Sequence, residues 1–437
     1  MKDSGIEWIG EIPEGWEIVP VRSCFDEVRT KNTNGQEQNA LQFKSGNIIS
    51  KANFNANTDD YVADTITNYT VVLPDTVMIN GLNLNYDFKS LRVALVKEKG
   101  VITSAYLAIF PDRKKISPQY ATYLFKGYET KMAFHNMGAG IRKTLGYKEF
   151  KNQPLLLPSK EEQNKISAYL DSKCSHIDTM LFRTRSGIEE YKKLKQAVIT
   201  QAVTKGVRGE REMKDSGNPW FGQIPTDWKL SRVGLHFSII LGKMLCNAPL
   251  NDTYTLEPYY CAADVHFDGV ADGERKKMWF SPVEKDLYRV LVGDLLVVEG
   301  GAGAGGSAIV ENQDSDTYIQ NSIMIVRSKG NTDNRYLRYL LEFLVKQGYI
   351  DIVCNKATIP HFTKDKLSCV PFCLCPTGEQ KEIADYLDAK CAEIDKLIAK
   401  KEQLVKELES YKKSLIYEVV TGKREIFTDI TRKFPNI

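Results

Sequence analysis

Amide, cationic and aromatic side chains gather in one short stretch of the chain, NLNYDFKSLR. The candidate contact residues within it are Asn83, Asn85, Lys89 and Arg92. Asparagine can hydrogen-bond to adenine through two atoms, and arginine can do the same with guanine, so this composition suits a nucleic-acid groove. Asn-rich stretches also form ordinary turns, and the composition alone leaves both interpretations open.

Two further cations, Arg142 and Lys143, could serve the same chemistry. They follow Gly138 and Gly140, and glycines let a backbone come close to another surface. The pair could therefore approach a phosphate or a guanine edge. A solvated turn explains the same residues equally well.

The second half of the chain carries its own candidate contacts. One group is the densest cationic patch of that half, beside Trp279, and the other belongs to a closing segment placed like that of Arg142. The candidates are Arg275, Lys276, Lys277, Lys356, His361 and Lys364. Lysine and arginine of this kind bind phosphates, although a run of charge is also typical of a solvated surface.

A glycine-rich stretch, EGGAGAGGS from Glu299 to Ser307, resembles a phosphate-binding loop in composition only. No Lys-Ser/Thr pair follows it, and the strand, glycine fingerprint and helix of a dinucleotide site are missing. We expect a flexible connection between strands, whose backbone could press against DNA.

Motifs of the common catalytic classes are missing from the sequence. It has no Gly-x-Ser-x-Gly, no HExxH, no Cys/His set with metal-ligand spacing, no Asn/Asp-Pro-Pro-Tyr/Phe and no nuclease carboxylate cluster. Cys369, Cys373 and Cys375 alternate with apolar residues, which is typical of a strand rather than a metal site. The chain is therefore expected to bind and assemble rather than to catalyse.

The composition is that of a globular protein of more than one domain. Among 437 residues, 59 Lys and Arg face 56 Asp and Glu, a net charge of +3. This balance excludes a histone-like polycation, but local clusters can still bind nucleic acid. We find no membrane span and no signal peptide, and nine cysteines, an odd number, do not form a disulfide framework. A cytoplasmic location is expected.

The sequence repeats itself. Ten residues of 1–16 recur at an offset of 212 in 213–228, and ten of the seventeen residues 162–178 recur at an offset of 217 in 379–395. A protein with two similar halves presents two similar surfaces, so the target is expected to have two parts.

The second repeat opens two long helical segments, residues 162–204 and 379–421, which contain no proline. Apolar residues at alternating steps of three and four indicate a coiled-coil seam. Roughly forty residues at ~1.5 Å each give a rod of ~60 Å, which needs a partner in water. We predict that the two segments pair antiparallel; packing on the adjacent domain or on another chain is the alternative.

The heptad spacing defines the expected seam of this helix pair. In the first helix Thr184 and Gly187 are weak points, and in the second Lys401 is the polar position. The expected seam residues are Ile177, Met180, Tyr191, Leu194 and Val198 in the first helix, and Ile394, Leu397, Leu404, Leu408, Tyr411 and Leu415 in the second.

The regions before the two helices are dissimilar in sequence and rich in short apolar runs separated by Gly, Asn and Asp. The fold class expected is α+β, with two globular domains, an antiparallel two-helix coiled coil and an internal pseudo-twofold repeat. The expected divisions are 1–157 for the first domain, 158–212 for the first helix and linker, 213–375 for the second domain, and 376–437 for the second helix and tail.

Several of the repeated segments carry a family resemblance. SGIEWIGEIPEGW (4–16), SGNPWFGQIPTDW (216–228), PSKEEQNKISAYLDSKCSHID (158–178) and PTGEQKEIADYLDAKCAEID (376–395) resemble the signature of type I restriction–modification specificity subunits. The resemblance spans the whole chain, including its alternation of variable and conserved regions.

The resemblance implies a non-catalytic DNA-binding subunit. Each of its two target-recognition domains would read one half of a bipartite, asymmetric site, and the helices would fix the spacer. The implied partners are double-stranded DNA, two methyltransferase subunits and restriction/translocase subunits, with S-adenosylmethionine, ATP and Mg²⁺ bound by those subunits and no cofactor bound by this chain.

Two other hypotheses remain open at the level of sequence. One is a coiled-coil adaptor whose two variable heads bind proteins. The other is a fused nuclease or methyltransferase acting alone.

Overall fold

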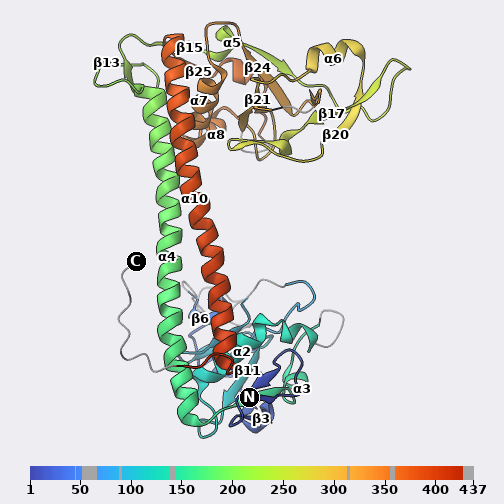
Figure 1. The fold of residues 1–437 in the computed structure, drawn as a ribbon, viewed down its shortest axis with the longest axis vertical. Coiled ribbons are helices and arrows are strands. Elements are labelled where there is room, and N and C mark those ends of the chain that lie inside the picture. Colours follow the sequence, from blue (N-terminus) through green and yellow to red (C-terminus); the bar gives the residue numbers. More distant parts are fainter. Residues whose placement is uncertain are drawn as a thin grey trace. The chain divides into compact units, whose positions relative to one another are not determined.

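The computed structural model describes residues 1–44, 46–51, 66–87, 91–137, 143–312, 315–354 and 360–426 (Figure 1). The chain packs as two compact units. Unit 1 comprises Met1–Arg185 with Glu402–Ile437, and unit 2 comprises Ser186–Lys401. Each unit therefore contains one variable region together with a segment of each long helix.

Unit 1 is built on a four-stranded antiparallel sheet of short, largely buried strands. Its order is β4 (Phe25–Glu27), β11 (Leu107–Pro111), β8 (Val77–Ile79) and β9 (Val93–Leu95). The described residues of unit 1 also form four two-stranded sheets: β1 (Lys2–Asp3) with β2 (Glu11–Ile12), β3 (Glu17–Pro20) with β12 (Pro154–Leu157), β5 (Leu41–Lys44) with β6 (Asn47–Ser50), and β7 (Thr70–Val72) with β10 (Gly100–Ile102).

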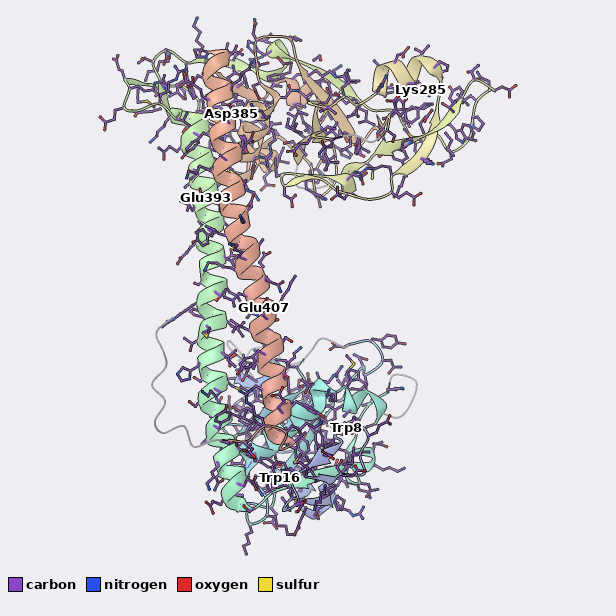
Figure 2. All side chains as sticks on the ribbon, viewed as in Figure 1. Trp8, Trp16, Lys285, Asp385, Glu393 and Glu407 are labelled. Carbon is purple, nitrogen blue, oxygen red and sulfur yellow. The ribbon has the colours of Figure 1, made fainter. Side chains whose placement is uncertain are left out.

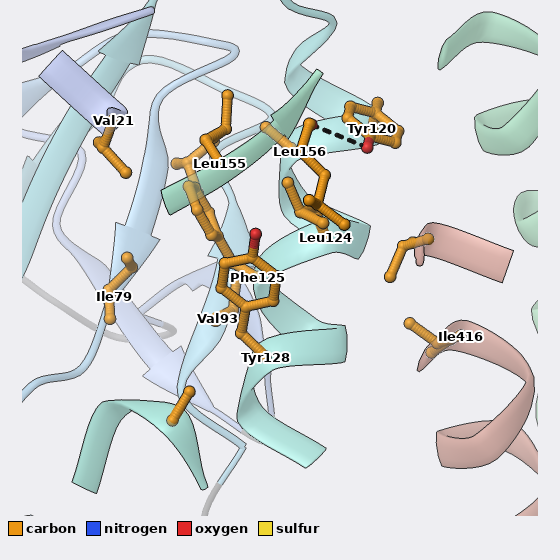
Figure 3. Close-up of a cluster of buried hydrophobic side chains, with 14 of the residues drawn as sticks. Val21, Ile79, Val93, Tyr120, Leu124, Phe125, Tyr128, Leu155, Leu156 and Ile416 are labelled. Carbon is orange, nitrogen blue, oxygen red and sulfur yellow. Dashed lines mark hydrogen bonds between the residues drawn. The ribbon is translucent and has the colours of Figure 1, made fainter. Parts of the chain in front are cut away.

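The helix α2 (Pro118–Thr130) covers this sheet through contacts with β8 and β9. It begins at a proline, which is favourable in the first helical turn because no amide donor is lost there. Its buried face carries Tyr120, Leu124 and Phe125, and the Tyr120 hydroxyl donates to the Leu156 carbonyl over 3.0 Å (Figure 3). Unit 1 is completed by η1 (Val21–Ser23), η2 (Ala133–Asn136) and α3 (Tyr147–Phe150).

Unit 2 repeats this plan with different residues. Its four-stranded antiparallel sheet runs in the order β16 (Phe237–Leu241), β24 (Ile323–Ser328), β21 (Leu295–Val298) and β22 (Ser307–Ile309). The helix α7 (Asn334–Lys346) packs on β21, β22 and β24 (Figure 1). The Tyr336 hydroxyl donates to the Cys373 carbonyl over 2.9 Å, which reproduces the contact of Tyr120 with Leu156 in unit 1; the tyrosines are 216 residues apart and the acceptors 217.

Unit 2 also has a three-stranded sheet, β20 (Lys276–Phe280), β17 (Thr255–Tyr260) and β23 (Tyr318–Ile319), in which β17 and β23 are parallel. Its other elements are β13 (Met213–Asp215), β14 (Gln223–Pro225), β15 (Lys229–Arg232), β18 (Val265–His266), β19 (Gly269–Val270), β25 (Pro371–Leu374), α5 (Val233–His236), η3 (Ala262–Asp264), α6 (Pro282–Tyr288), α8 (Tyr349–Val353) and α9 (Lys364–Ser368). Cys373 is buried on β25, as expected for an apolar strand. All nine cysteines are free thiols.

The two long helices are α4 (Lys160–Lys205) and α10 (Thr377–Val420). They pair antiparallel within each unit. In unit 1, Asp178 bonds to Lys412 over 2.6 Å. In unit 2, Lys195 bonds to Asp395 over 2.7 Å. The two ion pairs use the same two positions of the repeat, because Asp178 corresponds to Asp395 and Lys195 to Lys412 at an offset of 217. Each helix supplies the aspartate of one pair and the lysine of the other. Within the described residues, no helix is both long and apolar enough to cross a membrane.

The seam of this pair differs from the expected one at alternate positions. Ile177, Ile394 and Leu415 are buried, and Tyr191, Val198, Leu397 and Leu408 are half-buried. Met180 and Leu194, however, are each 49% exposed, and Leu404 and Tyr411 are 40% and 47% exposed. The residues that lie in the seam are instead Leu181, Lys195, Val405 and Lys412, each one position further along, and Ile188, which follows the weak point Gly187, is also buried.

The error has a physical origin in the heptad pattern. A step of three and a step of four from a seam position both lead to an apolar residue at Met180 and Leu181, so apolarity could not choose between them. Further along, the true seam positions are the lysines Lys195 and Lys412, whose stems lie in the interface while their ammonium groups reach aspartates.

Candidate nucleic-acid interface

Two loops occupy the same place in the two units. In unit 1, residues 80–87 follow β8 and close against residues 143–145, because the Leu145 amide donates to the Gly81 carbonyl over 2.9 Å and the Leu84 amide to the Lys143 carbonyl over 3.2 Å. These two segments are called the first loop surface. It unites two stretches that the sequence had presented separately.

The second loop surface consists of residues 299–306, which follow β21, and residues 360–362. The Phe362 amide donates to the Glu299 carbonyl over 2.6 Å, and the Gly301 amide to the Pro360 carbonyl over 3.2 Å. The closing segments of the two surfaces are related by an offset of 217, because the amide of Leu145 corresponds to that of Phe362 and the carbonyl of Lys143 to that of Pro360. The two surfaces are therefore equivalent in position while dissimilar in sequence.

The first loop surface presents an amide, a cation and an aromatic ring to solvent. Asn83 and Lys143 are exposed and have left-handed backbones, with φ of 53° and 36°. Tyr86 is 73% exposed, and Asn85 is half-buried. Arg142 and Lys89 lie outside the described residues. Tyr86 was missed as an individual site residue, although an exposed aromatic in such a loop is suited to stacking on a base.

Arg92, by contrast, does not lie on the surface, and its prediction as a DNA contact is wrong. Its side chain is 1% exposed. The guanidinium donates to the carbonyls of Asn80 and Leu82, each over 2.9 Å, and to that of Asp87. A sequence pattern cannot separate an arginine that faces DNA from one that satisfies buried carbonyls.

The second loop surface is mainly backbone. The glycine-rich stretch connects β21 to β22, as expected, and the amides at its end are bonded within the protein: Gly305 donates to Val298 over 3.0 Å and Gly306 to Gly303 over 2.8 Å. His361 is exposed, with Nδ1 3.4 Å from a Glu299 carboxylate oxygen.

Of the remaining candidates in this segment, Lys364 is exposed at the start of α9. Lys356 lies outside the described residues.

The cationic patch on β20 is smaller than its sequence indicates. The Arg275 guanidinium donates to Asp264 over 3.1 Å and lies 4.8 Å from the centre of the Tyr260 ring. Only 17% of its side chain is exposed, so these two contacts occupy most of the guanidinium, and its role as a DNA contact stays a prediction. Lys276 and Lys277 are exposed on the strand.

The repeated motif residues lie at the start of each long helix rather than on the loop surfaces. In unit 1 the Trp16 indole donates to Glu162 over 3.0 Å, and in unit 2 the Trp228 indole donates to Glu379 over 3.2 Å. Figure 2 shows Trp16 and Trp8, both in the repeated segment 1–16 of unit 1; this segment and the start of the long helix are called the frame of the unit. These contacts hold each variable region on its own helix segments.

A second matched contact reinforces this frame. The Tyr123 hydroxyl donates to Asp171, and the Tyr339 hydroxyl to Asp388, each over 2.7 Å. Burial raises the pKa of both tyrosines far above their usual range, and the aspartates raise it further. Both hydroxyls therefore stay protonated and remain donors. Within the described ranges, no cluster of three or more His, Cys, Asp or Glu side chains could hold a metal ion.

Comparison with known proteins gives consistent results. The family described as Type I restriction modification DNA specificity domain matches residues 227–407. The chain is 26% identical over 436 residues to the putative type I restriction enzyme MjaX specificity subunit of Methanocaldococcus jannaschii, covering 96% of each chain. It is 24% identical over 433 residues to the MjaVIII specificity subunit of the same organism, covering 94% of this chain and 93% of that one.

Two solved structures share the fold. One comes from work described as the structural basis underlying complex assembly and conformational transition of the type I R-M system; it has a TM-score of 0.69 and 17% identity, and covers 95% of this chain and 100% of that one. The other is the HsdS subunit from Thermoanaerobacter tengcongensis, with a TM-score of 0.52 and 16% identity, covering 95% and 98%.

Proposed function

Because this chain belongs to the family of type I restriction–modification specificity subunits, we propose that units 1 and 2 each read one half of a bipartite, asymmetric DNA site. The observation that carries this proposal is the pair of loop surfaces. They occupy equivalent places in two equivalent sheets, yet they present different chemistry. An asymmetric two-part site requires two reading domains that share one architecture but present different side chains.

The first loop surface supplies the chemistry for direct reading. Asn83 can pair bidentately with adenine, Tyr86 can stack on a base or contact a thymine methyl group, and Lys143 can bind a phosphate. The second surface offers a glycine backbone that can approach DNA closely, flanked by His361 and Lys364. The first half-site is thus read mainly by side chains and the second mainly by backbone and cations.

The helix pair has a separate role in this proposal. A fixed register between α4 and α10 gives a fixed spacer between half-sites, and the two repeat-related ion pairs favour one antiparallel register over its neighbours. We assign spacer control to this register.

Specificity subunits are generally non-catalytic, and DNA and the other subunits of the system are their partners. For this chain we propose two methyltransferase subunits, one for each copy of the repeated frame, and restriction/translocase subunits. S-adenosylmethionine, ATP and Mg²⁺ would then be bound by those subunits. Phe182, 73% exposed on α4, is a candidate contact for one methyltransferase subunit.

The test is selection of bound duplexes from a random pool, with this chain in complex with its co-encoded methyltransferase. A gapped, two-part, asymmetric motif is expected. Affinity should also fall by ~10³–10⁵ between roughly 50 and 200 mM salt if the chain makes six to ten phosphate contacts. No enrichment by an intact complex, together with a flat salt dependence, would favour the adaptor with protein-binding heads.

A further inference from the structure

We propose that Arg92 is a positioning residue that fixes the conformation of residues 80–87 from beneath, and so determines which bases the first half-site accepts. The inference rests on the proposed function, because it takes the first loop surface to be a reader of DNA. It concerns a side chain that does not reach the DNA itself.

The backbone of Arg92 closes the hairpin that carries the loop. β8 and β9 pair with Ile79 opposite Val93, and the Asn80 amide donates to the Arg92 carbonyl over 2.8 Å. The loop therefore leaves the sheet at Asn80 and re-enters it at Arg92, so that the arginine lies at the base of the loop.

The side chain of Arg92 then reaches back under the loop. It holds three carbonyls, of Asn80, Leu82 and Asp87, which lie before and after the exposed Asn83 and Tyr86. The Asp87 carboxylate adds an ion pair at 3.7 Å. Hydrogen bonds from a charged donor are stronger than those between neutral groups, and lysine cannot reproduce the planar fork that reaches several acceptors at once.

Neighbouring elements hold the clamp in place. Glu129 of α2 accepts the Arg92 amide, and the His135 ring of η2 lies with Nε2 3.2 Å from the Asp87 carbonyl. Since α2 packs on β8 and β9, the loop conformation is tied to the core of unit 1. A reader loop held at both its ends and its centre presents Asn83 and Tyr86 in one orientation.

Unit 2 holds its equivalent loop by a different means. Gly305 has φ of +83°, and a Cβ atom there would lie 2.9 Å from side-chain atoms of both Val345 and Ile350. The glycine loop is thus fixed by close packing on α7 and α8, with no counterpart of the Arg92 fork among its described contacts. A change at Arg92 and a change at Gly305 should therefore alter different halves of the site.

The experiment uses the full chain with its methyltransferase and random-duplex selection. Arg92→Lys and Arg92→Met are compared with Arg113→Lys, an exposed arginine of the same unit, and with Gly305→Ala. Both Arg92 variants should lose at least tenfold of the base preference in one half-site and keep the other. Gly305→Ala should affect the opposite half, and Arg113→Lys neither. If Arg92→Met prevents folding, Arg92→Lys, which keeps the charge, still tests the inference.

Three outcomes would overturn the inference: unchanged preferences in both Arg92 variants, loss in both halves, or the same half affected by Arg92 and Gly305. If Arg92 contacted a phosphate directly, its replacement would lower the slope of DNA affinity against salt concentration by about one. Replacement of a positioning residue leaves that slope unchanged. If the unaltered complex selects no two-part motif, the proposed function fails before the role of Arg92 is tested.

Discussion

The matched glutamates at the start of the two long helices offer a comparison inside one molecule. Glu162 and Glu379 are the same position of the repeat, and each accepts a tryptophan indole. Their surroundings differ. Glu162 is half-buried, whereas Glu379 is 0% exposed and also binds Arg211, with Arg208 at 3.9 Å. Replacing each by glutamine should therefore have unequal effects.

The magnitudes follow from these contacts. Glu162→Gln keeps an acceptor for Trp16 and loses only its charge, a cost of about 1 kcal/mol. Glu379→Gln removes the nearer and fully buried counter-charge of the Arg211 guanidinium, beside a buried indole, and leaves it only the exposed Asp227 carboxylate at 3.5 Å. Breaking a buried ion pair costs about 3–5 kcal/mol, and because 19% of the Arg211 side chain is exposed, we expect about 2–3 kcal/mol.

Hydrogen exchange measured peptide by peptide on the full chain separates the two units. Glu379→Gln should lower the protection of unit 2 peptides such as those of β14 and α7, and leave unit 1 unchanged; Glu162→Gln should show a smaller loss confined to unit 1. Equal losses, or a larger loss in Glu162→Gln, would refute the assignment of the extra energy to the Arg211 pair.

Three further predictions concern the reader domains and the helix pair. Burial raises the pKa of Glu129 to about 7, so folded unit 1 binds this proton more tightly than the unfolded chain does, and its stability should fall by about 1–2 kcal/mol as pH rises from about 5 to 7. Urea unfolding against pH should show this slope, and Glu129→Gln should flatten it. Exchanging the charges of the helix pair, Asp178→Lys with Lys412→Asp, should restore most of the roughly 0.5–1 kcal/mol lost in each single variant; purely additive losses in the double-mutant cycle would contradict the pairing. Lys143→Ala should weaken DNA binding uniformly across sequences and lower the salt slope by about one, whereas Asn83→Ala should relax base preference in one half-site with the slope unchanged; the reverse pattern would exchange the two assigned roles.

The helices and the repeated frame could be predicted from the sequence because their signals are local. The expected helices 162–204 and 379–421 correspond to α4 and α10, since caps, periodicity and missing prolines act within a few turns. The prediction of the seam failed at alternate positions, because the partner helix decides whether the next seam residue lies three or four positions along. Ion pairs between segments more than 200 residues apart, as for Lys195 and Asp395, are not a local property.

The candidate interface could be predicted only in part. Composition pointed to Asn83 and to Lys143, but their meeting on one surface depends on the pairing of residues far apart in the chain. The same composition misassigned Arg92, because an arginine that satisfies buried carbonyls has the same sequence signature as one that faces phosphate. Burial, which decides between them, is set by the tertiary fold.

Independent reading of one half-site by each unit can be tested by replacing residues 17–157 with the corresponding region of another specificity subunit and repeating the duplex selection with the methyltransferase complex. We expect one half of the motif to change while the other half and the spacer length stay the same. A change in both halves would contradict independent reading by the two units.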